Sequence, residues 1–187
     1  MPQFVRCKPC GYVIREDKLG KVCPACGAPL KAFEPYEDKV SPRRRFILNL
    51  DLHPILVHAP QTFAAILPLV VLVGILFPAF YASEVIAVAA FTALILPPAV
   101  LGAIFSGLVD GKVKMKKLTT PLMLRKIALG CCLLAVSSAN AAIIIVGGFQ
   151  PGTKLWVLFF SAASFVCAVL LGRTGKQLIL PLLPGRL

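Results

Sequence analysis

Four long segments without a charged residue dominate the second part of the chain. Residues 55–77, 85–109, 127–146 and 155–171 contain no Asp, Glu, Lys or Arg, and each has 17 to 25 residues. A helix needs roughly 20 residues, and at least about 17, to cross the hydrocarbon core of a membrane. As buried helices of a water-soluble protein, these segments would leave too few polar residues to cover the surface. They therefore predict four transmembrane helices.

The charged residues divide the chain into a polar head and an apolar body. Only 15% of the 187 residues are charged, against about 25% in a typical soluble domain. Residues 1–45 hold ten basic and five acidic side chains, whereas residues 46–187 hold ten and three. This composition excludes a disordered chain, a collagen and a small disulfide-rich secreted fold. We expect a small polar head at residues 1–38, a basic linker at 39–50 and a transmembrane domain at 51–187.

The arrangement of the four segments follows from their connections and prolines. The connections are short, which favours an antiparallel up-down four-helix bundle. Pro97 and Pro98 lie near the middle of the second segment. Each removes a backbone donor and clashes with the preceding turn, so we expect a kink there.

Lys and Arg are concentrated on one side of the expected membrane. Three lie just before the first segment, at residues 43–45, six lie in the second connection and three in the tail, whereas only Lys154 lies in the other connections. Positive residues are retained on the cytoplasmic side, so we expect a multi-pass protein of the cytoplasmic (inner) membrane with both termini in the cytoplasm. The twelve residues are Arg43, Arg44, Arg45, Lys112, Lys114, Lys116, Lys117, Arg125, Lys126, Arg173, Lys176 and Arg186.

The formal net charge of +12 raises the question of an acidic partner. Nucleic acid is one such partner, but the basic residues lie at the membrane borders, as the topology alone requires. We therefore expect contact with anionic membrane lipids and no nucleic acid.

Two Cys-x-x-Cys pairs give the head its clearest chemical signal. Cys7 and Cys10 form the first pair and Cys23 and Cys26 the second, with twelve residues between the pairs. Two residues between thiolates let one turn direct both sulfurs at one ion, so two such turns form a closed tetrahedral site for zinc or iron. Disulfides are disfavoured because the expected topology leaves these cysteines in the reducing cytoplasm. A head of about 40 residues buries too little apolar surface to fold alone, so the metal should also hold it together.

The residues around these pairs resemble a known family. Cys7-Lys-Pro-Cys10-Gly11-Tyr12, then Cys23-Pro-Ala-Cys26-Gly27 and the ending Lys31-Ala-Phe33-Glu34, are similar to the C-terminal rubredoxin-like domain of rubrerythrins. The resemblance covers about residues 3–38. It implies that the four cysteines bind one iron that exchanges single electrons. It also implies a small aromatic core of Tyr12 and Phe33 with Phe4 or Tyr36. Zinc stays open as the alternative metal, because zinc ribbons use similar turns.

The start of the membrane domain resembles a second family. The run His53-Pro54-Ile-Leu-Val57-His58, with Ser106-Gly107-Leu-Val-Asp110 later, is similar to an uncharacterised family of four-span membrane proteins. Its members often accompany redox domains, and many carry another histidine early in the third span. This chain has Gly130-Cys131-Cys132 there. The resemblance implies a haem b held by histidines, and an ionisable side chain within the membrane is itself a functional candidate. His53 and His58 are therefore candidate contacts for a quinone or a haem b.

The two histidines are not equivalent. Pro54 disfavours helical geometry at the preceding residue, so we expect His53 at the interface before the first helix begins. His58 lies one turn inside, where it either contacts a quinone or haem or forms a hydrogen bond with Gln61. The two positions are separated by about 140° on a regular helix. Cys131, Cys132 and Cys167 should lie in the same leaflet as His58, either lining a polar pocket with it or as helix-packing residues.

Two classes of function remain. The favoured one is an electron carrier or oxidoreductase subunit that passes single electrons between a soluble cytoplasmic redox partner and a membrane quinone or haem protein. The alternative is a zinc-ribbon membrane protein that acts as a docking subunit or transporter. No Ser-His-Asp set, phosphate-binding loop or pair of catalytic carboxylates indicates a hydrolase. The expected fold is a small metal-bound rubredoxin-like or zinc-ribbon-like β head followed by an all-α transmembrane four-helix bundle.

Overall fold

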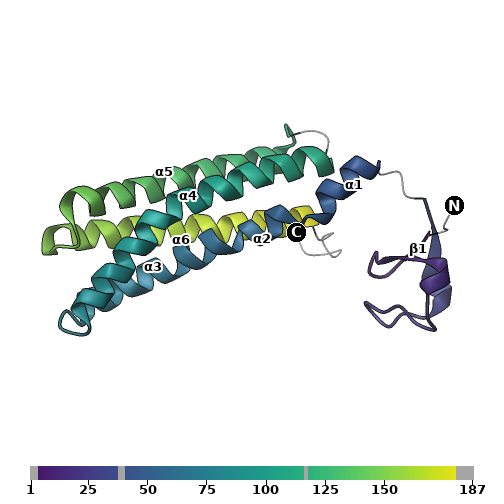
Figure 1. Ribbon diagram of the computed structural model, residues 1–187, viewed down its shortest axis with the longest axis horizontal. Coiled ribbons are helices and arrows are strands. Elements are labelled where there is room, and N and C mark those ends of the chain that lie inside the picture. Colours follow the sequence, from purple (N-terminus) through teal and green to yellow (C-terminus); the bar gives the residue numbers. More distant parts are fainter. Residues whose placement is uncertain (1–3, 38–40, 116–117, 180–187) are drawn as a thin grey trace. The chain divides into compact units, whose positions relative to one another are not determined.

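The computed structural model describes residues 4–37, 41–115 and 118–179 and divides the chain into two units. The first unit, Met1–Arg45, contains a three-stranded antiparallel sheet (Figure 1). Strand β1 (Phe4–Cys7) lies in the middle, between β2 (Val13–Arg15) and β3 (Phe33–Tyr36). Two short 3₁₀ turns, η1 (Glu16–Lys18) and η2 (Leu30–Ala32), connect to these strands.

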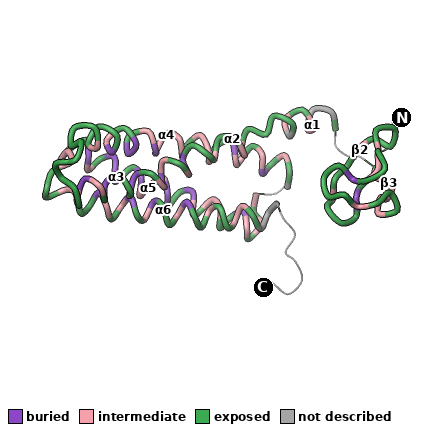
Figure 2. Tube along the Cα trace, turned by 90° about the horizontal axis from the view of Figure 1, so that it is seen from below, coloured by how far each residue is buried: buried purple, intermediate pink, exposed green. Residues whose placement is uncertain are grey.

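The head has almost no hydrophobic core of its own. Among its described residues, only Cys7 and Cys23 are buried (Figure 2). Phe4, Phe33 and Tyr36 are half-buried. Tyr12, which the resemblance placed in an aromatic core, keeps 40% of its surface exposed. The centre of this unit is therefore the cysteine cluster, and the sheet is a frame around it.

The second unit, Phe46–Leu187, is a bundle of helices. Helix α1 (Pro42–Asn49) begins in the first unit and ends in the second. It is followed by the short helix α2 (Leu52–Leu56) and by the long helices α3 (His58–Leu76), α4 (Ala82–Met115), α5 (Pro121–Gly147) and α6 (Pro151–Ile179). Each long helix packs against the next, and α6 also packs against α3, which closes an up-down four-helix bundle (Figure 1).

Four helical stretches are long and apolar enough to cross a membrane. They are Arg44–Leu76, Ala82–Lys114, Pro121–Gly147 and Pro151–Lys176. This confirms the predicted fold class and indicates a multi-pass membrane protein.

The interior of the bundle is built from small and medium apolar side chains. In α3 the buried residues Ala64, Leu67 and Val71 follow the helical repeat, and α4 contributes a similar stripe from Ala89 to Val100. Large apolar side chains face outward; Phe105, for example, has 72% of its surface exposed. An apolar exterior suits lipid rather than water. The buried cluster contains Ala64, Leu67, Val71, Ala89, Ala93, Leu96, Val100, Leu133, Ile144, Val157 and Ala168.

The structure contradicts one of the expectations drawn from prolines. His53 lies inside α2, so the expectation that it precedes the first helix is wrong. Pro54 is tolerated because it sits in the first turn, where backbone N–H groups have no intrahelical acceptor. The break falls instead at Asp51, which has a left-handed φ of 46°. Helix α4 continues through Pro97 and Pro98 as one element.

Candidate metal centre

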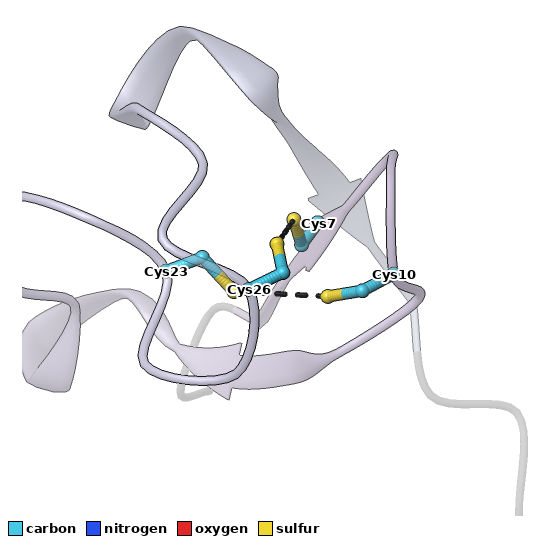
Figure 3. A group of neighbouring side chains, drawn as sticks. All are labelled: Cys7, Cys10, Cys23 and Cys26. Carbon is cyan, nitrogen blue, oxygen red and sulfur yellow. Dashed lines mark hydrogen bonds between the residues drawn. The ribbon is translucent and has the colours of Figure 1, made fainter.

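The first Cys-x-x-Cys pair is held by a tight turn after β1. The N–H of Gly11 donates to the carbonyl of Cys7 (2.7 Å), and the N–H of Cys7 donates to the carbonyl of Tyr12 (2.8 Å). Gly11 has a φ of 75°, a left-handed conformation that glycine adopts without a steric penalty. The turn places Cys10 on the same side as Cys7 (Figure 3).

The second pair repeats this geometry. The N–H of Gly27 donates to the carbonyl of Cys23 (2.8 Å), and the N–H of Cys23 donates to the carbonyl of Ala28 (2.8 Å). Gly27 has a φ of 73°. Both Cys-x-x-Cys-Gly runs therefore fold into the same turn, which explains why a glycine follows the second cysteine of each pair.

The two turns face each other and bring four sulfur atoms together. The sulfurs of Cys7, Cys10, Cys23 and Cys26 all lie within 4.8 Å of one another. The sulfurs of Cys7 and Cys26 are 3.6 Å apart, and those of Cys10 and Cys23 are 3.7 Å apart (Figure 3). A disulfide bond would need about 2.05 Å, so these cysteines are free thiols.

The sulfur spacing fits one tetrahedral metal ion. A metal–sulfur bond of about 2.3 Å gives a tetrahedron whose sulfur–sulfur edge is about 3.8 Å. Both sulfur contacts between the turns lie close to that value. Four soft thiolate ligands in a closed site suit zinc or iron. The residues present therefore fit the metal that the sequence indicates.

The four thiols differ in burial and in acidity. Cys7 and Cys23 are buried, whereas Cys10 and Cys26 are exposed. Burial raises the pKa of the Cys7 thiol to about 12. Burial acts in the same direction on Cys23, but the backbone amides of Ala25 and Cys26 donate hydrogen bonds to its sulfur and lower its pKa to about 7. A metal ion would displace the remaining thiol protons when it binds.

Both candidate histidines line one cavity in the bundle. This cavity has a volume of about 350 Å³ and is formed by residues of α2 to α6. His53 contacts two polar side chains there: its Nδ1 lies 3.2 Å from Ser106 Oγ, and its Nε2 lies 2.9 Å from Lys126 Nζ. His58 is exposed and lines the same cavity, as does Gln61. Lys126 was not predicted as a site residue, because in the sequence it reads only as one of the basic residues that set the orientation in the membrane.

The membrane cysteines do not line this cavity. The sulfur of Cys167 in α6 lies 3.9 Å from that of Cys132 in α5. Cys131 and Cys132 are exposed on the outside of the bundle. None of the three belongs to the cavity wall that His58 shares. The contact of Cys132 with Cys167 between α5 and α6 fits helix packing, and a polar pocket shared with His58 does not describe any of the three.

Comparison with known proteins identifies the head but not the bundle. Residues 6–34 match the family model of the rubrerythrin rubredoxin-like domain. This segment contains all four clustered cysteines, and the match confirms the resemblance drawn from their spacing. It does not extend into the four apolar helices. No significant match was found among curated proteins or among solved structures.

Proposed function

We propose that this chain is a membrane-anchored electron carrier whose head binds one iron through Cys7, Cys10, Cys23 and Cys26. It passes single electrons between a soluble cytoplasmic redox partner and a membrane acceptor, either a quinone or a haem-containing protein. The observation that carries the proposal is the cluster of four free thiols at tetrahedral spacing within a rubredoxin-like segment. The head would lie on the cytoplasmic side of the inner membrane, with both termini in the cytoplasm.

The head supplies what a one-electron site needs. Iron held by four thiolates changes between its ferric and ferrous forms, at a potential set by hydrogen bonds to the sulfurs and by solvent exposure. The amides of Ala25 and Cys26 donate to the sulfur of Cys23 and so balance the negative charge of the reduced site. Because Cys10 and Cys26 are exposed, a partner protein can approach the site from their side.

Metal content and colour test this proposal directly. The protein should be purified without oxygen from cells grown with ample iron. We expect one iron per chain and a visible absorption band that bleaches when the protein is reduced. Stoichiometric zinc with no visible absorption would contradict the proposal.

Replacing one ligand tests which residues hold the metal. We expect Cys10→Ser to release the metal and unfold the head, because the head has little other core. The bundle should remain inserted in the membrane. Cys131→Ser is the matched control, since Cys131 is an exposed thiol outside the cluster, and it should keep full metal content. Retention of the metal by Cys10→Ser would contradict the assignment of this ligand.

A zinc-ribbon docking module is the second candidate function. It is favoured by the observation that the only buried residues among the described part of the head are Cys7 and Cys23. A closed four-thiolate site of this kind is also what structural zinc uses to hold small domains together. In that case the bundle would act as a complex subunit or transporter. The metal analysis above separates the two candidates.

A further inference from the structure

The cavity in the bundle has a mostly apolar wall, into which five polar side chains are set: His53, His58, Gln61, Lys126 and Lys176. Glycines at positions 107, 130, 172 and 175 lie in its wall and leave room between α4, α5 and α6. Apolar residues such as Val100 and Leu133 form much of the remainder. A cavity of this size with few polar groups is typical of sites for small molecules.

Two of these side chains, Lys126 and His53, form a directed chain of hydrogen bonds with Ser106. The ammonium of Lys126 can only donate, so Nε2 of His53 accepts its hydrogen bond at 2.9 Å. The proton of the neutral ring then lies on Nδ1, which donates to Ser106 Oγ at 3.2 Å. The Ser106 hydroxyl in turn donates to the carbonyl of Ala103 at 3.1 Å. These hydrogen bonds fix the tautomer of His53 and hold Lys126 at the cavity wall. The ammonium of Lys126 has two more N–H donors that can bind a ligand.

Gly107 makes the position of His53 possible. A Cβ atom at this residue would lie 2.8 Å from Cε1 of His53 and 3.1 Å from its Nδ1. Any larger side chain would therefore push the imidazole away from Ser106 and Lys126. Gly102 lies on the same helix, but a Cβ atom added there would have no such neighbour within 4 Å.

We propose that this cavity binds the head of a membrane quinone, with Lys126 donating a hydrogen bond to a quinone carbonyl. The assignment rests on the proposed function, which calls for a membrane acceptor, and it adds the site and its main polar contact. A quinone is apolar except for carbonyl oxygens, so a mostly apolar wall with one held ammonium suits it. A phosphate head would call for several charged donors together. His53 and Ser106 act as positioning residues for Lys126, while Lys176 lines the cavity but is exposed.

Equilibrium binding of short-chain quinones tests the assignment. The full-length protein in phosphatidylcholine nanodiscs would be titrated with ubiquinone-1 and menaquinone-1. We expect saturable binding of at least one of them, weakened about tenfold or more in Lys126→Met, because a hydrogen bond from a charged donor contributes that much. Lys112→Met is the control: Lys112 is exposed on α4 and does not line the cavity, so its affinity should stay within twofold.

A pair of glycine variants tests the site independently, in case the lysine variant misfolds. Gly107→Ala should weaken quinone binding several-fold by displacing His53, whereas Gly102→Ala should bind as the unmodified protein does. Circular dichroism checks that each variant keeps its helices.

Three results would overturn the assignment. They are no saturable quinone binding, equal affinity in Lys126→Met or in Gly107→Ala, and displacement of the quinone by equimolar phosphatidylglycerol, which would mark a lipid headgroup site. Quinone binding by the bundle does not require iron in the head. A protein that holds zinc can still bind quinone, and a protein that holds iron can still lack a quinone site. The two proposals therefore fail separately.

Discussion

At the two turns that hold the cysteines, backbone conformation determines which residue is allowed. Gly11 and Gly27 both have left-handed φ angles, and each donates its N–H to the first cysteine of its pair. A residue with a Cβ adopts this conformation at a penalty of about 1–2 kcal/mol. The Cys-x-x-Cys-Gly pattern is therefore a geometric requirement of the site as well as a list of ligands.

Gly27→Ala should weaken the metallated head without touching a ligand. A Cβ at Gly27 meets no heavy atom within 4 Å, so the effect comes from the backbone alone. A strain of about 1–2 kcal/mol corresponds to a roughly 5- to 30-fold change in a folding equilibrium. We expect metal loss to a chelator to become faster by a similar factor. Gly20→Ala, which also has open space but no positive φ, should release metal as the unmodified protein does. Equal rates for the two variants would contradict this explanation.

The residues of the metal centre were predictable, whereas of the cavity residues only His53 and His58 were singled out from the sequence. Cys7, Cys10, Cys23 and Cys26 follow from local spacing, because each turn closes within six residues. The contact between His53 and Lys126 joins residues 73 positions apart and depends on how α2 packs against its neighbours. No local pattern carries that information. A glycine such as Gly107, which leaves space for a ring from another helix, gives no sequence signal of this role.

At the scale of single helices, apolar segments predicted the existence of the spans better than their ends. Helix α4 extends to Met115, beyond the apolar segment that ends at residue 109. Asp110 and Lys114 lie one turn apart on this extension and form an ion pair of 3.0 Å. Such pairs support a helix outside the hydrocarbon core, where a search for uncharged segments does not detect it.

Helix α5 carries a polar side chain in the interior of the bundle. Asn140 is fully buried, and neither its amide oxygen nor its amide nitrogen has a hydrogen-bond partner among the described residues. Ser137, one turn earlier, is equally buried but donates to the carbonyl of Leu134. The two residues therefore differ in how well their polar atoms are satisfied.

Asn140→Ala should raise the stability of the bundle. A buried polar group without a partner is unfavourable by about 1–3 kcal/mol, which exceeds the loss from the small void left by alanine. We expect a higher apparent Tm in detergent for this variant. Ser137→Ala removes a satisfied hydroxyl and should give no increase. A lower Tm for Asn140→Ala would mean that its amide makes a stabilising contact.

The two ends of the whole bundle differ in chemistry. At the end where α3 turns into α4, exposed aromatic residues such as Tyr81 and Trp156 gather, as they do at membrane interfaces. Lys154, in the first turn of α6, is the one basic residue between positions 127 and 172. Its ammonium donates to the carbonyl of Gly74 at 3.1 Å and lies 5.3 Å from the ring centre of Phe149. This lysine therefore has a structural reason to be there, namely to cap the end of α3.

Cysteine labelling from the two sides of the membrane tests the orientation of the whole molecule. With twelve basic residues against Lys154 alone, we expect the end that carries Ser83 to face outward and the end that carries Lys114 to face the cytoplasm. Ser83→Cys should react with a membrane-impermeant maleimide in intact cells, and Lys114→Cys only after permeabilisation. Both side chains are exposed, so access alone does not distinguish them. The unmodified chain measures the background of its own seven cysteines. The opposite labelling pattern would place Cys7, Cys10, Cys23 and Cys26 in an oxidising compartment, where disulfides rather than a metal would join them, and the electron-carrier proposal would then fail.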